Sequence, residues 1–238
     1  MKSDLTPRLR AVASAVIELG ECEKMCDVGC DHAYLPIYLL KKGKIKKAYA
    51  CDVREGPLKA AEKNIALNGF ENGIKIVLSD GLKEVKNELF DCITVCGMGG
   101  ILISKIISEA EECAKKAGRL ILQPMSEAEH LRKYLFDNGF TIYDEKIARE
   151  DERYYSIICV RKGIEESYDS FDLKFGKKIF DCTDCKNDDV KRYLIKNLKA
   201  LERNLEAKKN SGRENTDELS YIVEKLKKHV NNFLKNER

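Results

Sequence analysis

The sequence contains no hydrophobic run long enough to cross a membrane. None approaches the roughly 20 apolar residues that a spanning helix needs. Residues 1–16 carry charges within the first apolar stretch and show no small-residue cleavage site, which argues against a secretory signal. We therefore expect no membrane attachment and a cytoplasmic location.

The ten cysteines lack the pattern of a disulfide framework or a zinc site. Several of them, among them Cys26, Cys51 and Cys92, lie inside apolar runs, as buried thiols do. The one C-x-x-C pair, Cys182 and Cys185, has no second pair and no paired histidines to complete a metal site. We expect reduced structural thiols and no bound metal.

Glycine is missing where a dinucleotide-binding turn needs it. The stretch MCDVGCDHAYLP, residues 25–36, starts like that turn at Gly29, but Asp31 and Tyr34 replace the later glycines of G-x-G-x-x-G. A pyrophosphate requires bare backbone amides and no nearby anion, so Asp27 and Asp31 disfavour it. A ligand with a sulfonium centre and an ammonium group, such as S-adenosylmethionine, suits these carboxylates.

Apolar strand-like runs alternate with helical segments from about residue 24 to 162. Continuous apolar runs are typical of a parallel sheet covered on both faces. The last two runs are separated only by residues 150–152, which predicts an antiparallel hairpin at the sheet edge. We therefore predict a doubly wound, Rossmann-like α/β domain with a seven-stranded sheet. The expected strands are 24–28, 48–52, 75–78, 92–96, 120–123, 141–147 and 155–160, and the expected helices are 35–42, 58–68, 101–116 and 127–138.

Residues 187–238 contain two amphipathic segments, which predict an antiparallel, coiled-coil-like helical hairpin. This tail carries thirteen Lys and Arg against nine Asp and Glu, whereas the preceding 186 residues sum to −1. Such a surplus suits a polyanion, although charged helix faces are usually only solvated. We expect domains at 1–163 and 187–238, joined by a linker or docking segment at 164–186. The candidate phosphate contacts are Lys191, Arg192, Lys199, Arg203, Lys225 and Lys228.

Small or acidic residues follow each of the first four expected strands, where ligands bind in an open parallel sheet. Asp52 is placed to accept from ribose hydroxyls and Asp80 from an adenine amino group, while Gly29 allows a close approach. Each alone is equally a common turn residue, but together they favour a nucleoside ligand. The expected cofactor contacts are Asp27, Gly29, Asp31, Asp52, Val53, Asp80, Gly81, Gly97 and Met98.

Five segments of the chain together carry a resemblance to a known family. They are DVGCDHAYLP at 27–36, EGPL at 55–58, SDGL at 79–82, GMGG at 97–100 and LQP at 122–124. In combination and in this order they resemble the bacterial tRNA (adenine-22-N1)-methyltransferases, the TrmK family, over residues 5–162. The tail also matches that family's coiled-coil domain in pattern. The resemblance implies a class I methyltransferase fold and methyl transfer from S-adenosylmethionine, with S-adenosylhomocysteine as product, to N1 of an adenine in the D-arm of tRNA. It implies no protein partner.

The implied reaction suggests roles for the residues after the first strand. N1 lies on the Watson–Crick edge, so the base must be extruded, and its methylation leaves a cation unless the N6 amino group loses a proton. We expect Asp31 or His32 to hydrogen-bond N6 or accept its proton, and Tyr34 to orient the base. Alignment of N1 with the methyl carbon should supply most of the rate. The expected adenine-edge contacts are Gly99, Gly100, Gln123 and Pro124.

Other functions remain open from the sequence. One is methyl transfer to another RNA, a protein or a small metabolite. The basic tail mildly disfavours a small metabolite as the substrate. A second is a non-catalytic nucleic-acid-binding protein on the same fold, which the intact acidic positions disfavour. A nicotinamide dehydrogenase is disfavoured by the incomplete glycine motif.

Overall fold

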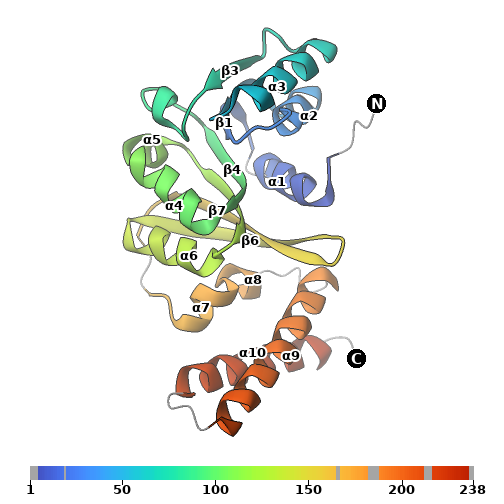
Figure 1. Ribbon diagram of the computed structural model, residues 1–238, viewed down its shortest axis with the longest axis vertical. Coiled ribbons are helices and arrows are strands. Elements are labelled where there is room, and N and C mark those ends of the chain that lie inside the picture. Colours follow the sequence, from blue (N-terminus) through green and yellow to red (C-terminus); the bar gives the residue numbers. More distant parts are fainter. Residues whose placement is uncertain (1–4, 19, 165–166, 182–187, 212–215, 236–238) are drawn as a thin grey trace. The chain divides into compact units, whose positions relative to one another are not determined.

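The chain folds as two compact units, Met1–Glu166 and Ser167–Arg238 (Figure 1). The computed structural model describes residues 5–18, 20–164, 167–181, 188–211 and 216–235. Within these ranges no helix is both long and apolar enough to cross a membrane. The described cysteines are free thiols and most of them are buried, whereas Cys182 and Cys185 lie outside the described residues.

The first unit is built on a seven-stranded sheet with the order β3-β2-β1-β4-β5-β7-β6. Strands β1 to β5 pair in parallel, whereas β7 is antiparallel to both β5 and β6. The predicted seven-stranded sheet and its terminal hairpin are thus confirmed. The strands are β1 (Cys22–Val28), β2 (Ile45–Asp52), β3 (Ile74–Leu78), β4 (Cys92–Gly99), β5 (Leu120–Ser126), β6 (Phe140–Glu150) and β7 (Arg153–Lys162).

Helices cover both faces of this sheet, as its continuously apolar strands require (Figure 1). The first three pack on one face, where Val12, Leu39 and Ile65 share a core with the strands. The expected helix at 101–116 is two helices, because Ala110 leaves helical geometry with φ −138° and ψ 42°. The helices are α1 (Pro7–Glu18), α2 (Tyr34–Lys41), α3 (Glu55–Leu67), the 3₁₀ turn η1 (Lys83–Val85), α4 (Gly100–Glu109), α5 (Glu111–Lys116) and α6 (Ala128–Asp137).

The strand order places β1 between β2 and β4, so the chain reverses its winding direction at β1. Ligands of open parallel sheets bind beyond the carboxyl ends of the strands at such a reversal. Register fixes the neighbours of the β1 end, where Asp27 lies beside Ala50 of β2 and Thr94 of β4. The topology therefore gathers the ends of β1, β2, β3 and β4 around one crevice.

The second unit is a small helical assembly. Its two long helices are the expected pair, and their apolar stripes bury Leu194 and Leu226 against each other. Phe171 and Phe175, from the segment expected as a linker or docking segment, are buried in the same core. The functional division at residues 163 and 186 remains a prediction. The helices are α7 (Ser170–Phe175), α8 (Lys178–Asp181), α9 (Asp188–Asn210) and α10 (Asp217–Lys235).

Candidate active site

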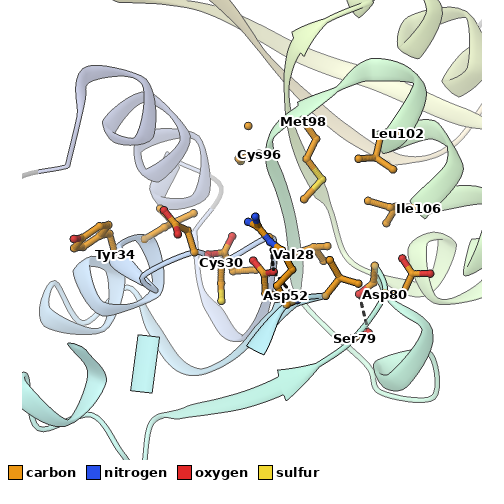
Figure 2. A pocket seen from close by; sticks show the side chains of 18 of the residues that line it. Val28, Cys30, Tyr34, Asp52, Ser79, Asp80, Cys96, Met98, Leu102 and Ile106 are labelled. Carbon is orange, nitrogen blue, oxygen red and sulfur yellow. Dashed lines mark hydrogen bonds and ion pairs between the residues drawn. The ribbon is translucent and has the colours of Figure 1, made fainter. Parts of the chain in front are cut away.

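A cavity of about 510 Å³ opens at the carboxyl ends of β1 to β4 in the first unit. Figure 2 shows Met98, Leu102 and Ile106 along one side, with Asp80 and Tyr34 toward opposite ends. The cavity thus offers apolar walls and several carboxylates, a combination that suits a nucleoside bearing positive charge. It is lined by Arg8, Leu9, Asp27, Val28, Gly29, Cys30, Asp31, Tyr34, Leu35, Asp52, Val53, Arg54, Ser79, Asp80, Gly81, Cys96, Gly97, Met98, Leu102 and Ile106.

The turn after β1 uses its own backbone amides. The N–H groups of Gly29 and Cys30 both donate to the carbonyl oxygen of Cys51, at 2.8 and 3.0 Å. Gly29 has a φ of +74°, and a Cβ there would lie 2.3 Å from Cε of Met98. Since these amides are already paired, they do not form the anion cradle that a pyrophosphate requires.

The same turn continues through two left-handed residues that are not glycine, Asp31 at φ 47° and Ala33 at φ 55°. Such backbone is uncommon and collects at functional sites. The turn is anchored by Asn64, whose side-chain amide donates to the carbonyl oxygen of His32 at 2.8 Å. The consequence is that Asp31 and Tyr34 reach the cavity wall.

His32 does not line the cavity but contacts both residues that do. Its Nε2 lies 3.6 Å from Oδ1 of Asp31, and its ring stacks on that of Tyr34 with centroids 5.2 Å apart. The three predicted catalytic residues therefore form one cluster, in which Tyr34 exposes an aromatic face. An exposed aromatic face next to a carboxylate suits stacking on a base and hydrogen bonding to its amino group.

Asp27 is the buried acid of the cavity. Its Oδ1 accepts a hydrogen bond of 2.6 Å from Oγ1 of Thr94. Burial raises the pKa of Asp27 from 3.8 to about 7, against the lowering effect of that hydrogen bond. A carboxyl held in this way ionises more readily when a cation is placed beside it.

The ends of β2 and β3 present two further acids in different surroundings. Asp52 is almost fully buried, and its Oδ1 accepts from the backbone N–H of Arg54 at 3.0 Å. Asp80 is exposed, and a hydrogen bond from Lys83 holds its pKa below the usual value. Ser79 orders the turn around Asp80, because its hydroxyl donates to the carbonyl oxygen of Gly81 at 2.9 Å.

The glycines at the end of β4 and the start of α4 differ in what lies close to them. β4 continues to Gly99, and its register with β5 shifts on either side of Met98. A Cβ on Gly100 would lie 2.2 Å from the carbonyl oxygen of Glu127, so the close approach there is made by the chain itself. Gly97 differs, because it lines the cavity with a φ of +77°.

Gln123 is fully buried beneath this loop. Its Oε1 accepts from the Gly97 N–H at 3.0 Å and from Nη1 of Arg8 at 2.5 Å, while its Nε2 donates to the carbonyl oxygen of Pro124 at 2.9 Å. The side chain is committed to holding the loop, and neither Gln123 nor Pro124 lines the cavity.

All nine predicted cofactor contacts line the cavity, as do Asp31 and Tyr34 of the predicted catalytic group. The predicted adenine-edge residues Gly99, Gly100, Gln123 and Pro124 do not line this cavity, and their contact with the adenine stays a prediction. Sequence reasoning missed Leu102 and Ile106, whose spacing of four along a helix was the available signal. It also missed Arg8, to which no motif or spacing in the sequence points. Burial raises the pKa of the Cys30 and Cys96 thiols, so both line the cavity as neutral groups.

The predicted phosphate contacts of the second unit differ in availability. Those exposed to solvent are Arg192, Lys199, Arg203 and Lys228. Lys191 is half-buried. Lys225 does not point outward: its ammonium lies 2.6 Å from Oδ2 of Asp169 and 4.6 Å from the ring centroid of Phe171. We therefore leave Lys225 out of any tRNA-facing surface.

A seven-stranded sheet of this order, with β7 antiparallel and an acidic nucleoside-sized cavity at its strand ends, defines a class I S-adenosylmethionine-dependent methyltransferase. A family model described as a methyltransferase domain matches residues 5–158. A tRNA (adenine(22)-N(1))-methyltransferase of Bacillus subtilis (strain 168) is 34% identical over 173 residues, which cover 72% of this chain and 71% of that protein. The chain belongs to this family, the TrmK-like tRNA m1A22 methyltransferases.

Solved structures agree over nearly the whole chain. Streptococcus pneumoniae Sp1610, in complex with S-adenosyl-L-methionine, is 33% identical with a TM-score of 0.79, and the match covers 95% of this chain and 100% of that one. M. capricolum TrmK, in complex with S-adenosyl-homocysteine, is 29% identical with a TM-score of 0.71, covering 98% and 97%. The fold is thus shared with proteins that bind the methyl donor and its product.

Proposed function

We propose that this protein transfers the methyl group of S-adenosylmethionine to N1 of adenine 22 in tRNA. The observation that carries the proposal is the cavity itself, which joins the buried Asp27 and Asp52 to an apolar wall while its turn amides are already paired. When bound, S-adenosylmethionine supplies an electrophilic methyl carbon on a positively charged sulfur. Cytoplasmic tRNA is the substrate on this account, and a cytoplasmic location is part of the proposal.

We assign the donor contacts by chemistry. We assign Asp52 to the ribose hydroxyls, and the hydrogen bond that its Oδ1 accepts from the Arg54 amide at the end of β2 supports this role. Asp80 lies at the next strand end and suits the adenine amino group. Val53, Leu102 and Ile106 supply apolar contacts for the base. Asp27 and Asp31 then face the positively charged end of the donor.

The Asp31, His32 and Tyr34 cluster is assigned to the acceptor base. Tyr34 offers an exposed ring on which an extruded adenine can stack, and His32 supports that ring from the other side. Asp31 and His32 are the groups near enough to one another to accept and pass on the N6 proton. Alignment of N1 supplies most of the rate, since proton removal follows readily once N1 is methylated.

The second unit is assigned to holding tRNA. Its exposed cations on α9 and α10 are arranged on helices whose apolar sides are consumed in their own core. Arg and Lys side chains on such surfaces bind phosphates without reading sequence. The base-specific step therefore belongs to the first unit.

The decisive experiment is methylation of unmodified tRNA transcripts with labelled S-adenosylmethionine, followed by mapping of the modified nucleotide. Label at N1 of adenine 22 is expected, and a transcript with another base at position 22 is the matched control. Label on a different nucleotide, on protein or on a small metabolite would replace this proposal with one of the alternatives. Donor binding without any transfer would favour a non-catalytic role.

A further inference from the structure

Arg8 of α1 reaches the cavity from an element that precedes the sheet. Its Nε donates to Oε2 of Glu150 at 3.1 Å and its Nη1 to Oε1 of Gln123 at 2.5 Å, and the guanidinium lies 5.5 Å from the ring centroid of Tyr155. Its side chain is only 20% exposed. A guanidinium has five N–H groups, and within the described chain the remaining three make no hydrogen bond. The group is therefore fixed in place with donors still free.

The cavity offers few other donors for an anion. The amides of Gly29, Cys30 and Gly97 are already paired with acceptors in the protein. Among the described residues that line the cavity, the cations are Arg8 and Arg54. Arg54 is largely exposed, with its Nε 3.7 Å from Oδ1 of Asp52, at the end of the cavity assigned to ribose.

The position of Arg8 selects one part of the donor. Asp52 and Asp80 mark the nucleoside end at β2 and β3, so the amino-acid end must extend over β1 and β4. Arg8 lies on that side, since a Cβ on Gly97 would be 3.6 Å from its Nη1. An α-amino acid carries an ammonium and a carboxylate on one carbon, and here two acids, Asp27 and Asp31, line the same cavity as the guanidinium of Arg8.

Resting on the proposed function, we propose that Arg8 binds the carboxylate of the methyl donor, while Asp27 and Asp31 face its ammonium group. Gln123 and Glu150 are the positioning residues that aim the guanidinium. The protein should therefore bind ligands with an intact amino-acid end more tightly than nucleosides that lack the carboxylate.

The alternative anion is an RNA phosphate reaching Arg8 from its other side. That side opens on a separate hollow of about 380 Å³. Its lining includes the carboxylates of Glu150, Asp151 and Glu152, against the cations of Arg8 and Arg153. Three carboxylates around the approach disfavour a phosphate, so the donor's carboxylate is the better partner.

The test is calorimetric binding of S-adenosylhomocysteine and of its analogue without the carboxylate to the full-length protein and to Arg8→Gln. Loss of a charge-assisted hydrogen bond should weaken binding of S-adenosylhomocysteine roughly 10- to 100-fold and leave the analogue within about threefold. Arg10→Gln is the matched control, since Arg10 lies on the same helix, bonds the carbonyl oxygen of Leu5 and does not line the cavity. Arg8→Lys keeps the charge but not the fork, and should retain part of the preference.

Equal weakening of both ligands by Arg8→Gln, with Arg8→Lys behaving alike, would assign Arg8 to shaping the cavity and overturn the proposal. Unchanged binding of both, with a raised KM for tRNA, would assign it to RNA and overturn it as well. If Arg8→Gln does not fold, the comparison of the two ligands on Arg8→Lys decides by the same criterion. Because binding is measured without tRNA, failure to methylate tRNA would reject the proposed function and leave this result readable.

Discussion

Replacement of Asp27 by asparagine should stabilise the ligand-free protein, and more so at high pH. Burial raises the pKa of Asp27 from 3.8 to about 7. A group whose pKa is raised on folding contributes stability below its unfolded pKa and loses it as pH rises toward the folded pKa. One pKa unit corresponds to about 1.4 kcal/mol, so ionisation of Asp27 lowers the free energy of unfolding by about 4 kcal/mol in total once the pH is above 7. About 2 to 3 kcal/mol of this decrease occurs between pH 5 and pH 8. Asparagine keeps an acceptor for Thr94 but carries no charge.

Urea unfolding of the wild type and Asp27→Asn at pH 5 and pH 8 measures this difference directly. The gain from the substitution should be about 2 to 3 kcal/mol larger at pH 8, and binding of S-adenosylmethionine should weaken. Asp80→Asn is the control at the same rim, because that carboxyl is exposed and its pKa is lowered by Lys83. The same gain at both pH values would refute the idea that the Asp27 carboxylate is desolvated in the free protein.

Three further results are expected. Gly29→Ala should cost about 1 to 2 kcal/mol of folding stability and weaken S-adenosylhomocysteine binding, because alanine resists a φ of +74° and its Cβ would collide with Met98. Adding Met98→Ala should recover only the part of the loss that comes from this collision. Full recovery would show that backbone strain at position 29 is negligible. His32→Ala should lower kcat for tRNA methylation at least 100-fold and leave S-adenosylhomocysteine affinity within a few-fold in calorimetry, because His32 does not line the cavity; equal losses would place His32 in cofactor binding. Asp31→Ala should lower kcat as well, and it should also weaken S-adenosylhomocysteine binding, because Asp31 is assigned to the ammonium group of the donor. Charge reversal at Lys199, Arg203 and Lys228 together should weaken tRNA binding in filter assays and flatten its salt dependence, with cofactor binding unchanged as the control; unaltered tRNA affinity would assign the second unit another role.

Prediction from the sequence worked best where short-range pattern and topology act together. The apolar runs at 24–28 and 48–52 predicted both the strands and the convergence of their carboxyl ends, since parallel strands share one direction. It was less informative at Gly99 and Gly100, which are expected to contact the adenine edge. In the structure, a Cβ on Gly100 would meet the carbonyl oxygen of Glu127. A glycine in the sequence indicates that another group packs closely against its Cα, but it does not tell whether that group belongs to a ligand or to the protein itself.

The sequence by itself determined three features of the protein. Acidic residues stand at or just after the ends of β1, β2 and β3, the dinucleotide-binding glycine motif is incomplete, and the C-terminal helical pair carries more Lys and Arg than Asp and Glu. These depend on neighbours in the chain, through hydrophobic period and turn composition. Only the tertiary structure decided that Arg8 enters the cavity, that Gln123 is consumed in holding Gly97, and that Lys225 turns inward to Asp169. Each depends on a side-chain hydrogen bond to a residue 26 to 115 positions away, which the packing of the folded chain fixes and local pattern does not encode.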